Sequence, residues 1–273
     1  MTENRIDCAS NEVVLIITGC ISPILNQTSL ILKDIKERYR QYIDCLKYYI
    51  EESLFCNIIF CDNSGYDVPD KEDLCNYALA KGKRLEWLSF RGDLEKTASI
   101  GNKGLGEDEI MDYIFANCDF ARRSKSFVKI TGRLQLKNID VLLRAAEYGK
   151  NYFYRDLYGR VNHGVDTRFY VMDTKFYLNN IRKCYERSGN FNLRYEDTIS
   201  ELLDGKYELL PAYPKFIGSS SGNGFNYNKE GRVKLSFLSL LCWLGLYNKY
   251  YSIIFWYYAA IHKMREYLNC PYW

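Results

Sequence analysis

Short, continuously apolar runs alternate along the chain with longer stretches in which apolar residues recur every three or four positions. Residues 13–20 (VVLIITGC) are rich in β-branched side chains and reach Gly19, which predicts a buried strand. Residues 28–54 place apolar side chains on one side and Lys, Arg and Glu on the other, which predicts an amphipathic helix. A second apolar run, 57–61, precedes the turn cluster DNSG. Strand, helix and strand in this order open a parallel α/β sheet, because parallel strands need crossover helices.

The same alternation continues to about residue 203. It predicts further strands at 85–90, 127–132 and 168–172. It predicts further helices at 107–118, 138–148, 174–185 and 195–203. We therefore expect an α/β fold in which a Rossmann-type, mostly parallel sheet is flanked by helices. Open sheets of this kind bind ligands beyond the carboxyl ends of their strands. The ends of the first, second and fourth predicted strands are Thr18-Gly19, Asp62-Asn63 and Thr131-Gly132-Arg133.

The composition of the chain changes near residue 229. From there to the last residue it carries six Lys or Arg and two Glu, a net charge of +4 (six minus two) that exceeds the +3 of the whole chain. We expect two parts with different roles. These are an α/β domain that would hold a binding site over residues 1–228 and an amphipathic helical tail over residues 229–273.

The apolar runs of this tail are each too short to span a bilayer. They cover residues 235–246 and 251–261, and Asn248-Lys249 lies between them. Their Trp and Tyr residues and interspersed cations suit a helix pair that lies in the interface of an anionic membrane. Residues 234–273 are therefore predicted to make peripheral membrane contact. The alternative is that these helices pack against the sheet or form a dimer interface.

The overall composition excludes several classes of function. The chain has 37 Lys and Arg against 34 Asp and Glu, too weak a bias for nucleic acid as the main partner. Its ten Cys lie without CxxC spacing inside apolar runs, which indicates buried thiols in a reducing compartment. With only two His, a structural zinc site is not expected. The polar N-terminus does not have the pattern of a signal peptide, so we expect a cytoplasmic protein.

The first stretch that indicates chemistry is NKGLGE, residues 102–107. It places two glycines, Gly104 and Gly106, and the cation Lys103 just before a predicted helix. Free backbone N–H groups, the positive end of the helix dipole and an ammonium could converge there on an anion. The alternative is ordinary turn chemistry, because glycines at a helix start often serve only the turn.

The order of the motifs resembles the GT-A class of nucleotide-sugar glycosyltransferases, and more narrowly the bacterial enzymes of capsule or lipopolysaccharide O-antigen synthesis. In that class a first strand and a second strand ending in Asp hold the nucleoside. A loop resembling NxGxG then leads into a helix, and the next strand ends at the diphosphate. The matching pieces, within residues 13–138, are VVLIITGCISP, IIFCDNSGYD, GNKGLGE and FVKITGRLQLKN.

The resemblance implies a GT-A-like fold and a site for a nucleotide-sugar donor. The residues that it assigns to that site are Thr18, Gly19, Asp62, Asn63, Lys103, Gly104, Gly106, Glu107, Lys129, Thr131, Gly132 and Arg133. A saccharide acceptor, lipid-linked or part of a growing surface polysaccharide, is the second expected partner.

One departure from the class concerns metal. GT-A enzymes commonly end the later strand with a DxD motif whose carboxylates hold Mg²⁺ or Mn²⁺ against the diphosphate, whereas this chain presents KITGR. Lys129 and Arg133 can meet a phosphate directly, Arg with a bidentate fork. We therefore expect donor binding without a divalent metal or other cofactor, unless Asp166 supplies a ligand for Mg²⁺ or Mn²⁺. The alternative is that Lys129 snorkels to the surface and Arg133 is solvated.

An inverting glycosyl transfer needs a general base for the acceptor hydroxyl. In many inverting members of the class this is a carboxylate in an acidic pair at the start of a late helix. Glu196 and Asp197 match that pair in order and position, so either is a candidate base. Helix capping is the alternative, and a retaining mechanism would not need the base. Asp166 and Arg168, near a strand end, are expected to contact donor or acceptor.

The sequence thus predicts a cytoplasmic hexosyltransferase, peripheral on the inner face of the cell membrane, that uses a nucleotide donor such as a UDP-sugar. One alternative is a non-catalytic sugar-nucleotide or glycan-binding scaffold. Another is a nucleotidyltransferase. That class normally has Mg²⁺ carboxylates and a Gly-rich loop directly after the first strand, where this chain has TGCISP.

Overall fold

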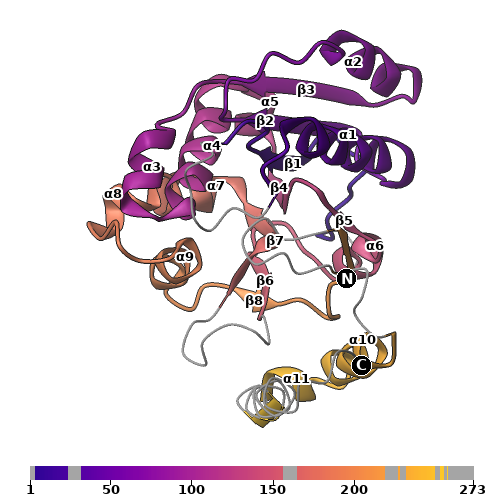
Figure 1. Ribbon diagram of the computed structural model, residues 1–273. Helices are drawn as coiled ribbons and strands as arrows, with labels where there is room; N and C mark the ends of the chain where they lie inside the picture. The colour runs from indigo at the N-terminus through magenta and orange to yellow at the C-terminus, as the bar shows by residue number, and fades with distance from the viewer. Residues whose placement is uncertain are drawn as a thin grey trace, which may run out of the picture.

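The computed structural model describes most of the chain, and its centre is a β-sheet with the strand order β3-β2-β1-β4-β7-β6-β8 (Figure 1). Seven strands form this sheet within the described residues. The described residues are 4–23, 32–155, 165–218, 227, 232–249, 253, 254 and 257.

Four strands at one side of the sheet are parallel and confirm the predicted strands. They are β1 (Val13–Gly19), β2 (Asn57–Asp62), β3 (Arg84–Ser89) and β4 (Ser126–Thr131). β1 pairs with β2 on one side and with β4 on the other, and β2 pairs with β3. Every residue of β1 and β2 is buried, which explains why both read as continuous apolar runs.

Helices cover both faces of the parallel strands. α1 (Ile35–Glu52) and α2 (Lys71–Ala80) pack with Leu15 on one face, and α4 (Lys103–Asn117) packs with Ile16 on the other. α1 begins later than predicted because Asp34 caps it, accepting a hydrogen bond from the Glu37 amide. The first residues of the predicted helix, 28–31, lie outside the described part of the chain. The sequence did not predict α2, α3 (Leu94–Ile100) or α5 (Asp119–Arg123).

The other side of the sheet is mixed. β7 (Asp166–Asp173) is antiparallel to β4 and to β6 (Tyr152–Tyr154), and β6 is parallel to β8 (Glu208–Leu209). Because β7 runs in the opposite direction, its first residues lie at the same edge as the ends of β1, β2 and β4. A separate antiparallel pair consists of β5 (Leu134–Leu136) and β9 (Phe216–Gly218).

Helical segments follow β5 and β7, largely where the sequence predicts them. The predicted helix 138–148 shortens to α6 (Ile139–Leu143). The predicted helix 174–185 is interrupted at Lys183, whose φ is +58°. The segments on either side are α7 (Thr174–Phe176), the π-helix η1 (Tyr177–Ile181) and α8 (Cys184–Ser188). α9 (Tyr195–Leu203) has the predicted bounds.

Two helices, α10 (Arg232–Trp243) and α11 (Leu246–Lys249), form the described part of the C-terminal tail (Figure 1). They contact the α/β body through Leu238, which is fully buried, and through Tyr247, whose hydroxyl donates to the Arg155 carbonyl at 2.9 Å. None of the helices in the described residues is long and apolar enough to cross a bilayer.

Candidate functional site

The sheet contains a topological switch point between β1 and β4. From β1 the chain continues through β2 to β3 in one direction, and it then returns to pair β4 with the other side of β1. The loops that leave β1 and β4 therefore diverge and leave a crevice at the carboxyl ends of the strands, where open α/β sheets bind ligands.

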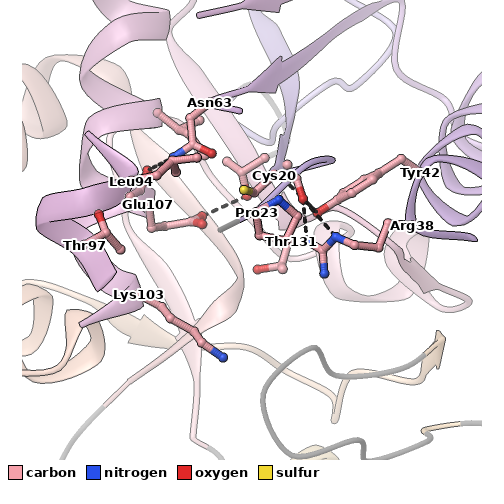
Figure 2. Close-up of a pocket in the computed structure, with 14 residues that line it drawn as sticks. Cys20, Pro23, Arg38, Tyr42, Asn63, Leu94, Thr97, Lys103, Glu107 and Thr131 are labelled. Atoms are coloured by element: carbon pink, nitrogen blue, oxygen red, sulfur yellow. Dashed lines mark hydrogen bonds between the residues drawn. The ribbon is translucent and has the colours of Figure 1, made fainter. Parts of the chain in front are cut away.

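A pocket occupies this crevice (Figure 2). Its walls include Thr18 near the end of β1, Cys20 just after it, Thr131 at the end of β4, Arg38 from α1 and Lys103 from α4. Its volume is about 140 Å³. Pockets that enclose a whole drug-sized ligand typically have roughly 300–1,000 Å³. The pocket is therefore suited to part of a ligand, such as a base or a phosphate group.

Three cations surround the pocket. Figure 2 shows Arg38 and Lys103 reaching it from opposite sides. Arg38 is 3% exposed, and its Nε donates to the carbonyls of Cys20 and Ile21 at 3.2 and 3.1 Å. Burial, and then the positive charges of Arg38 and Arg133, lower the pKa of the Lys103 ammonium. The charges of these three side chains therefore act on one another across the same space.

Arg133 lies beside the pocket wall in a strained backbone conformation. Its φ is +85°, a region that non-glycine residues rarely adopt. Its guanidinium lies 5.7 Å from the ring centroid of Tyr42, which lines the pocket, and donates to Gln41 at 3.1 Å. Its Nε is buried without a hydrogen-bond partner. Among the described residues, neither Arg133 nor Arg38 forms an ion pair with a carboxylate.

Lys129 has a different environment. Its side chain is 1% exposed and forms an ion pair with Glu107. Its ammonium also donates to the Thr131 hydroxyl at 3.0 Å and to the Thr167 carbonyl at 2.8 Å. The hydroxyl of Thr18 donates to the same Glu107 carboxylate at 2.9 Å. The structure therefore places Lys129 beneath the pocket, where its charge is balanced by the protein itself.

Asp62 and Asn63, at the end of β2, serve different purposes. Asp62 is fully buried and accepts hydrogen bonds from the Ile21 amide at 2.7 Å and from Ser64. Burial raises the pKa of Asp62, and its carboxylate ties the loop after β1 to the turn after β2. Asn63 lines the pocket, and its Oδ1 is buried without a partner. At the end of β2, the side-chain oxygen that accepts no hydrogen bond from the described residues is therefore Asn63 Oδ1, and not an oxygen of Asp62.

The interpretation of residues 102–106 as a loop before the helix is wrong, because α4 already begins at Lys103. Asn102 is the N-cap, and its Oδ1 accepts from the Gly104 amide at 3.0 Å. A Cβ at Gly104 would lie 2.6 Å from the Cβ of Tyr195, so the glycine permits α4 to pack closely against α9. Lys103, Gly106 and Glu107 line the pocket, whereas Gly104 serves this packing.

The remaining glycines of the predicted site also permit close packing. A Cβ at Gly132 would lie 2.4 Å from the Thr18 carbonyl oxygen, which accepts a hydrogen bond from the Gly132 amide at 2.8 Å. A Cβ at Gly19 would lie 2.8 Å from the Phe60 ring. Both glycines let the ends of β1 and β4 approach their neighbours, and Gly19 also contributes to the pocket wall.

A second polar cluster lies at the start of β7, on the same sheet edge. The Asp166 carboxylate accepts hydrogen bonds from the Arg168 guanidinium at 3.0 and 2.6 Å. Burial alone would raise the pKa of Asp166, but the adjacent positive charge of Arg168 lowers it below the ordinary value. The Arg168 guanidinium also lies within 5.2–5.8 Å of the ring centroids of Tyr227, Phe216 and Tyr154. The pair is therefore held in a fixed position.

The two candidate bases at the start of α9 differ in their partners. Asp197 accepts two hydrogen bonds from Arg194, each of 2.9 Å. Glu196 accepts one from the Thr167 hydroxyl at 3.2 Å. Burial, and then the negative charge of Asp166, raise the pKa of Glu196. A carboxylate with raised proton affinity is better suited to act as a base near neutral pH, and of the two side chains Glu196 is the one that no guanidinium among the described residues binds through paired hydrogen bonds.

Thr167 connects the pocket network to this second cluster. Its carbonyl accepts from Lys129, and its hydroxyl donates to Glu196. The polar side chains at the ends of β1 and β4 are thus linked to those at the start of β7 and α9. Both clusters are placed on one edge of the sheet, where a donor and an acceptor could meet.

Sequence reasoning missed Arg38 and Tyr42, both of which line the pocket. The signal was present, because Arg38 is in phase with the buried residues Tyr42, Cys45 and Tyr49 of α1. A cation at a position where the helix period requires an apolar side chain indicates a buried positive charge. An anion that balances the charge of Arg38 would then approach from the pocket.

The described residues contain no group of three or more His, Cys, Asp or Glu side chains placed to hold a metal ion. Asp166, which the sequence offered as a possible metal ligand, forms an ion pair with Arg168. Independence from a divalent metal stays a prediction.

No protein-family model matches the chain, and neither does any curated protein. Among solved structures, it is similar to the apo form of the glycosyltransferase GlyE from Streptococcus pneumoniae TIGR4, at 14% identity and a TM-score of 0.49, over 72% of this chain and 44% of GlyE. It is also similar to HddC from Yersinia pseudotuberculosis (12% identity, TM-score 0.39, 76% and 93% of the two chains). A third similarity is to the PaToxG glycosyltransferase (11% identity, TM-score 0.30, 70% and 68%).

The chain spans less than half the length of GlyE. All three identities are below 15% and all three TM-scores are below 0.5. These similarities therefore do not determine an activity or a substrate. The α/β fold class rests on the strand order and on the parallel pairing of β1 to β4.

Proposed function

We propose that the protein is a glycosyltransferase that binds a nucleotide sugar in the pocket between β1 and β4 and transfers the sugar to a saccharide acceptor. The observation that supports this most strongly is the convergence of Arg38, Lys103 and Arg133 at the switch point of the sheet. A diphosphate supplies the negative charge that such a set of cations would attract, and arginine binds it with two parallel hydrogen bonds.

Each wall of the pocket has a role in this proposal. Arg38, Lys103 and Arg133 would hold the diphosphate without a divalent ion. The unpaired Oδ1 of Asn63 would accept a hydrogen bond from an N–H of the base; the imide N–H of uracil in a UDP-sugar is one such donor. Lys129 would act indirectly, by fixing the Glu107 carboxylate in the pocket wall.

The chemistry at the second cluster would be general base catalysis. Glu196 would take the proton from an acceptor hydroxyl while that oxygen attacks the anomeric carbon of the donor sugar. The bond between the anomeric carbon and the diphosphate oxygen would break, and the nucleoside diphosphate would leave with its new negative charge. The cations of the pocket would stabilise that charge as it develops. We further infer that the acceptor is a growing surface polysaccharide, lipid-linked during its synthesis, made in the cytoplasm.

A panel of nucleotide sugars, incubated with the protein in EDTA and analysed by mass spectrometry, tests the proposal. Slow hydrolysis of one donor, most of all a UDP-sugar, is the expected result. Binding of a donor without turnover on any acceptor would favour the scaffold. Formation of a nucleotide sugar from a nucleoside triphosphate and a sugar phosphate, dependent on Mg²⁺, would identify a nucleotidyltransferase. Absence of any nucleotide-sugar binding would contradict the proposal.

A further inference from the structure

The helix α10 exposes apolar side chains on the side that does not contact the α/β body. Phe237 and Leu240 of the helix, and Leu244 directly after its last residue, are each 50% exposed, whereas Leu238 is fully buried. The spacing of the three exposed residues, three and four positions, places them in one row along the helix. We call this row the outer apolar face. An amphipathic helix normally buries its apolar side, so a row of this kind indicates a partner.

The charge of the surrounding chain restricts the nature of that partner. Residues 231–265 contain five Lys or Arg and neither Asp nor Glu, so this stretch has a net charge of +5. Lys249, at the end of α11, is exposed. Two copies of the chain that met through this region would bring +5 against +5. A surface that combines an apolar layer with negative charge matches both the exposed apolar row of the helix and the positive charge of the tail.

The length of the helix determines how it could meet such a surface. The 12 residues of α10 extend about 18 Å at 1.5 Å per residue, well short of the roughly 30 Å hydrocarbon core of a bilayer. The helix therefore fits a position in the plane of the interface, with its apolar side at the acyl boundary and cations at the headgroups. Tyr257, which is 63% exposed further along the tail, has the amphipathic ring that membrane interfaces favour.

We propose that the outer apolar face of α10 docks on an anionic lipid surface, with the helix axis parallel to the membrane plane. This surface is separate from the pocket at the sheet edge. The docking does not depend on glycosyltransferase activity and can be tested without a substrate.

The test is co-sedimentation of the full chain with vesicles of phosphatidylcholine, with and without phosphatidylglycerol. We expect binding to the anionic vesicles that weakens as salt increases, because headgroup attraction is screened. In the variant Leu240→Glu the partition coefficient should fall about tenfold or more, since a carboxylate replaces an apolar side chain at a negative surface. The triple variant F237E/L240E/L244E should remain in the supernatant.

The matched control is Leu79→Glu, at a leucine of α2 that is 71% exposed and lies outside the tail. It should bind vesicles like the unchanged protein. Circular dichroism checks that each variant is folded, and Leu240→Ser, which adds no charge, gives a second reading if a Glu variant unfolds. The proposal is overturned if the unchanged protein ignores anionic vesicles, or if Leu240 variants bind as well as it does. A dimer in sedimentation velocity that the triple variant abolishes, without vesicle binding, would also overturn it.

Discussion

The cations at the carboxyl edge of the sheet fall into two groups. Lys129 is 1% exposed and has a carboxylate partner, Glu107, within the protein. Arg38 and Arg133 are also buried, at 3% and 6% exposed, but their described partners are carbonyls, an amide and an aromatic ring. A buried charge is costly unless it is compensated. We conclude that Lys129 has a structural role at the sheet edge. The positive charges of the two arginines could instead be balanced by an anionic ligand.

The same contrast separates the two carboxylates in the first turn of α9. Asp197 is held by the guanidinium of Arg194, whereas Glu196 receives one hydroxyl hydrogen bond and has a raised pKa. In both clusters, we assign a structural role to the side chain that forms an ion pair within the protein. We propose a chemical role for the charged side chain that forms no such pair in the described part of the chain. Substitutions in both clusters test this division between paired and unpaired charges.

Removal of the base should have the largest effect. Glu196→Gln should lower the turnover of the sugar transfer by about 10²–10⁴-fold, the range of a general base, with little effect on donor binding. Asp197→Asn should lower turnover much less, because Asp197 is occupied by Arg194. Steady-state kinetics with the donor found in the panel measures both. Equal losses in the two variants would contradict the division.

Removal of the paired cation should destabilise the protein. Lys129→Met leaves the partly buried Glu107 carboxylate without its partner, which should lower the free energy of unfolding by about 3–5 kcal/mol. Urea denaturation followed by circular dichroism measures the change. The matched control is Lys125→Met, just before the same strand, because the Lys125–Glu12 pair is exposed and should contribute little. A stable Lys129→Met variant with impaired diphosphate binding would instead place Lys129 at the ligand.

Removal of an arginine without a carboxylate partner should affect the ligand. Arg133→Met should weaken the binding of a nucleoside diphosphate by about 10–100-fold, since hydrogen bonds to charged groups contribute about 1.5–3 kcal/mol. The stability of the free protein should change less than in Lys129→Met. Arg123→Met, at an exposed arginine of α5, is the matched control. Fluorescence or calorimetric titration measures the affinities, and unchanged affinity in Arg133→Met would remove this residue from the site.

The pH dependence should show a smaller, directional effect. Burial and then the charge of Asp166 raise the pKa of Glu196, and the proposed reaction would need its deprotonated form. The rate should therefore fall as pH decreases through a pKa above that of an ordinary glutamate. In Asp166→Asn the negative charge is removed, so that pKa should decrease and the acid limb should move to lower pH. A pH–rate profile of kcat/KM measures both, and an unmoved limb would argue against Glu196 as the base.

Much of the fold could be predicted from the sequence because its strands are buried on both faces. The runs at β1 and β2 are almost continuously apolar, β4 carries a single charged residue, Lys129, and the helix pattern of α1 and α9 is regular. Short strands such as β6 and β8 were not predicted, since two or three residues cannot display a period. The start of α4 was misplaced because its glycines suggested a loop, although Asn102 is a strong N-cap.

The location of the candidate site could be predicted from the sequence, but the roles of its individual residues could not. The strand ends indicated the correct edge, because a parallel sheet brings them together. The partner of Lys129 lies on another element, 22 positions earlier at Glu107, and no local pattern reveals such a pairing. Arg38, Lys103 and Arg133 are likewise distant in sequence, so their closeness in the fold could not be predicted.

Fixed cations at the switch point are proposed to bind a diphosphate without a divalent metal. Calorimetric titration in EDTA with UDP and with uridine, on the unchanged protein and on Arg38→Met and Arg133→Met, tests it most directly. UDP should bind more tightly than uridine, and this difference should shrink in both variants. Equal affinity for UDP and uridine in the unchanged protein, or a difference that both variants retain, would contradict it.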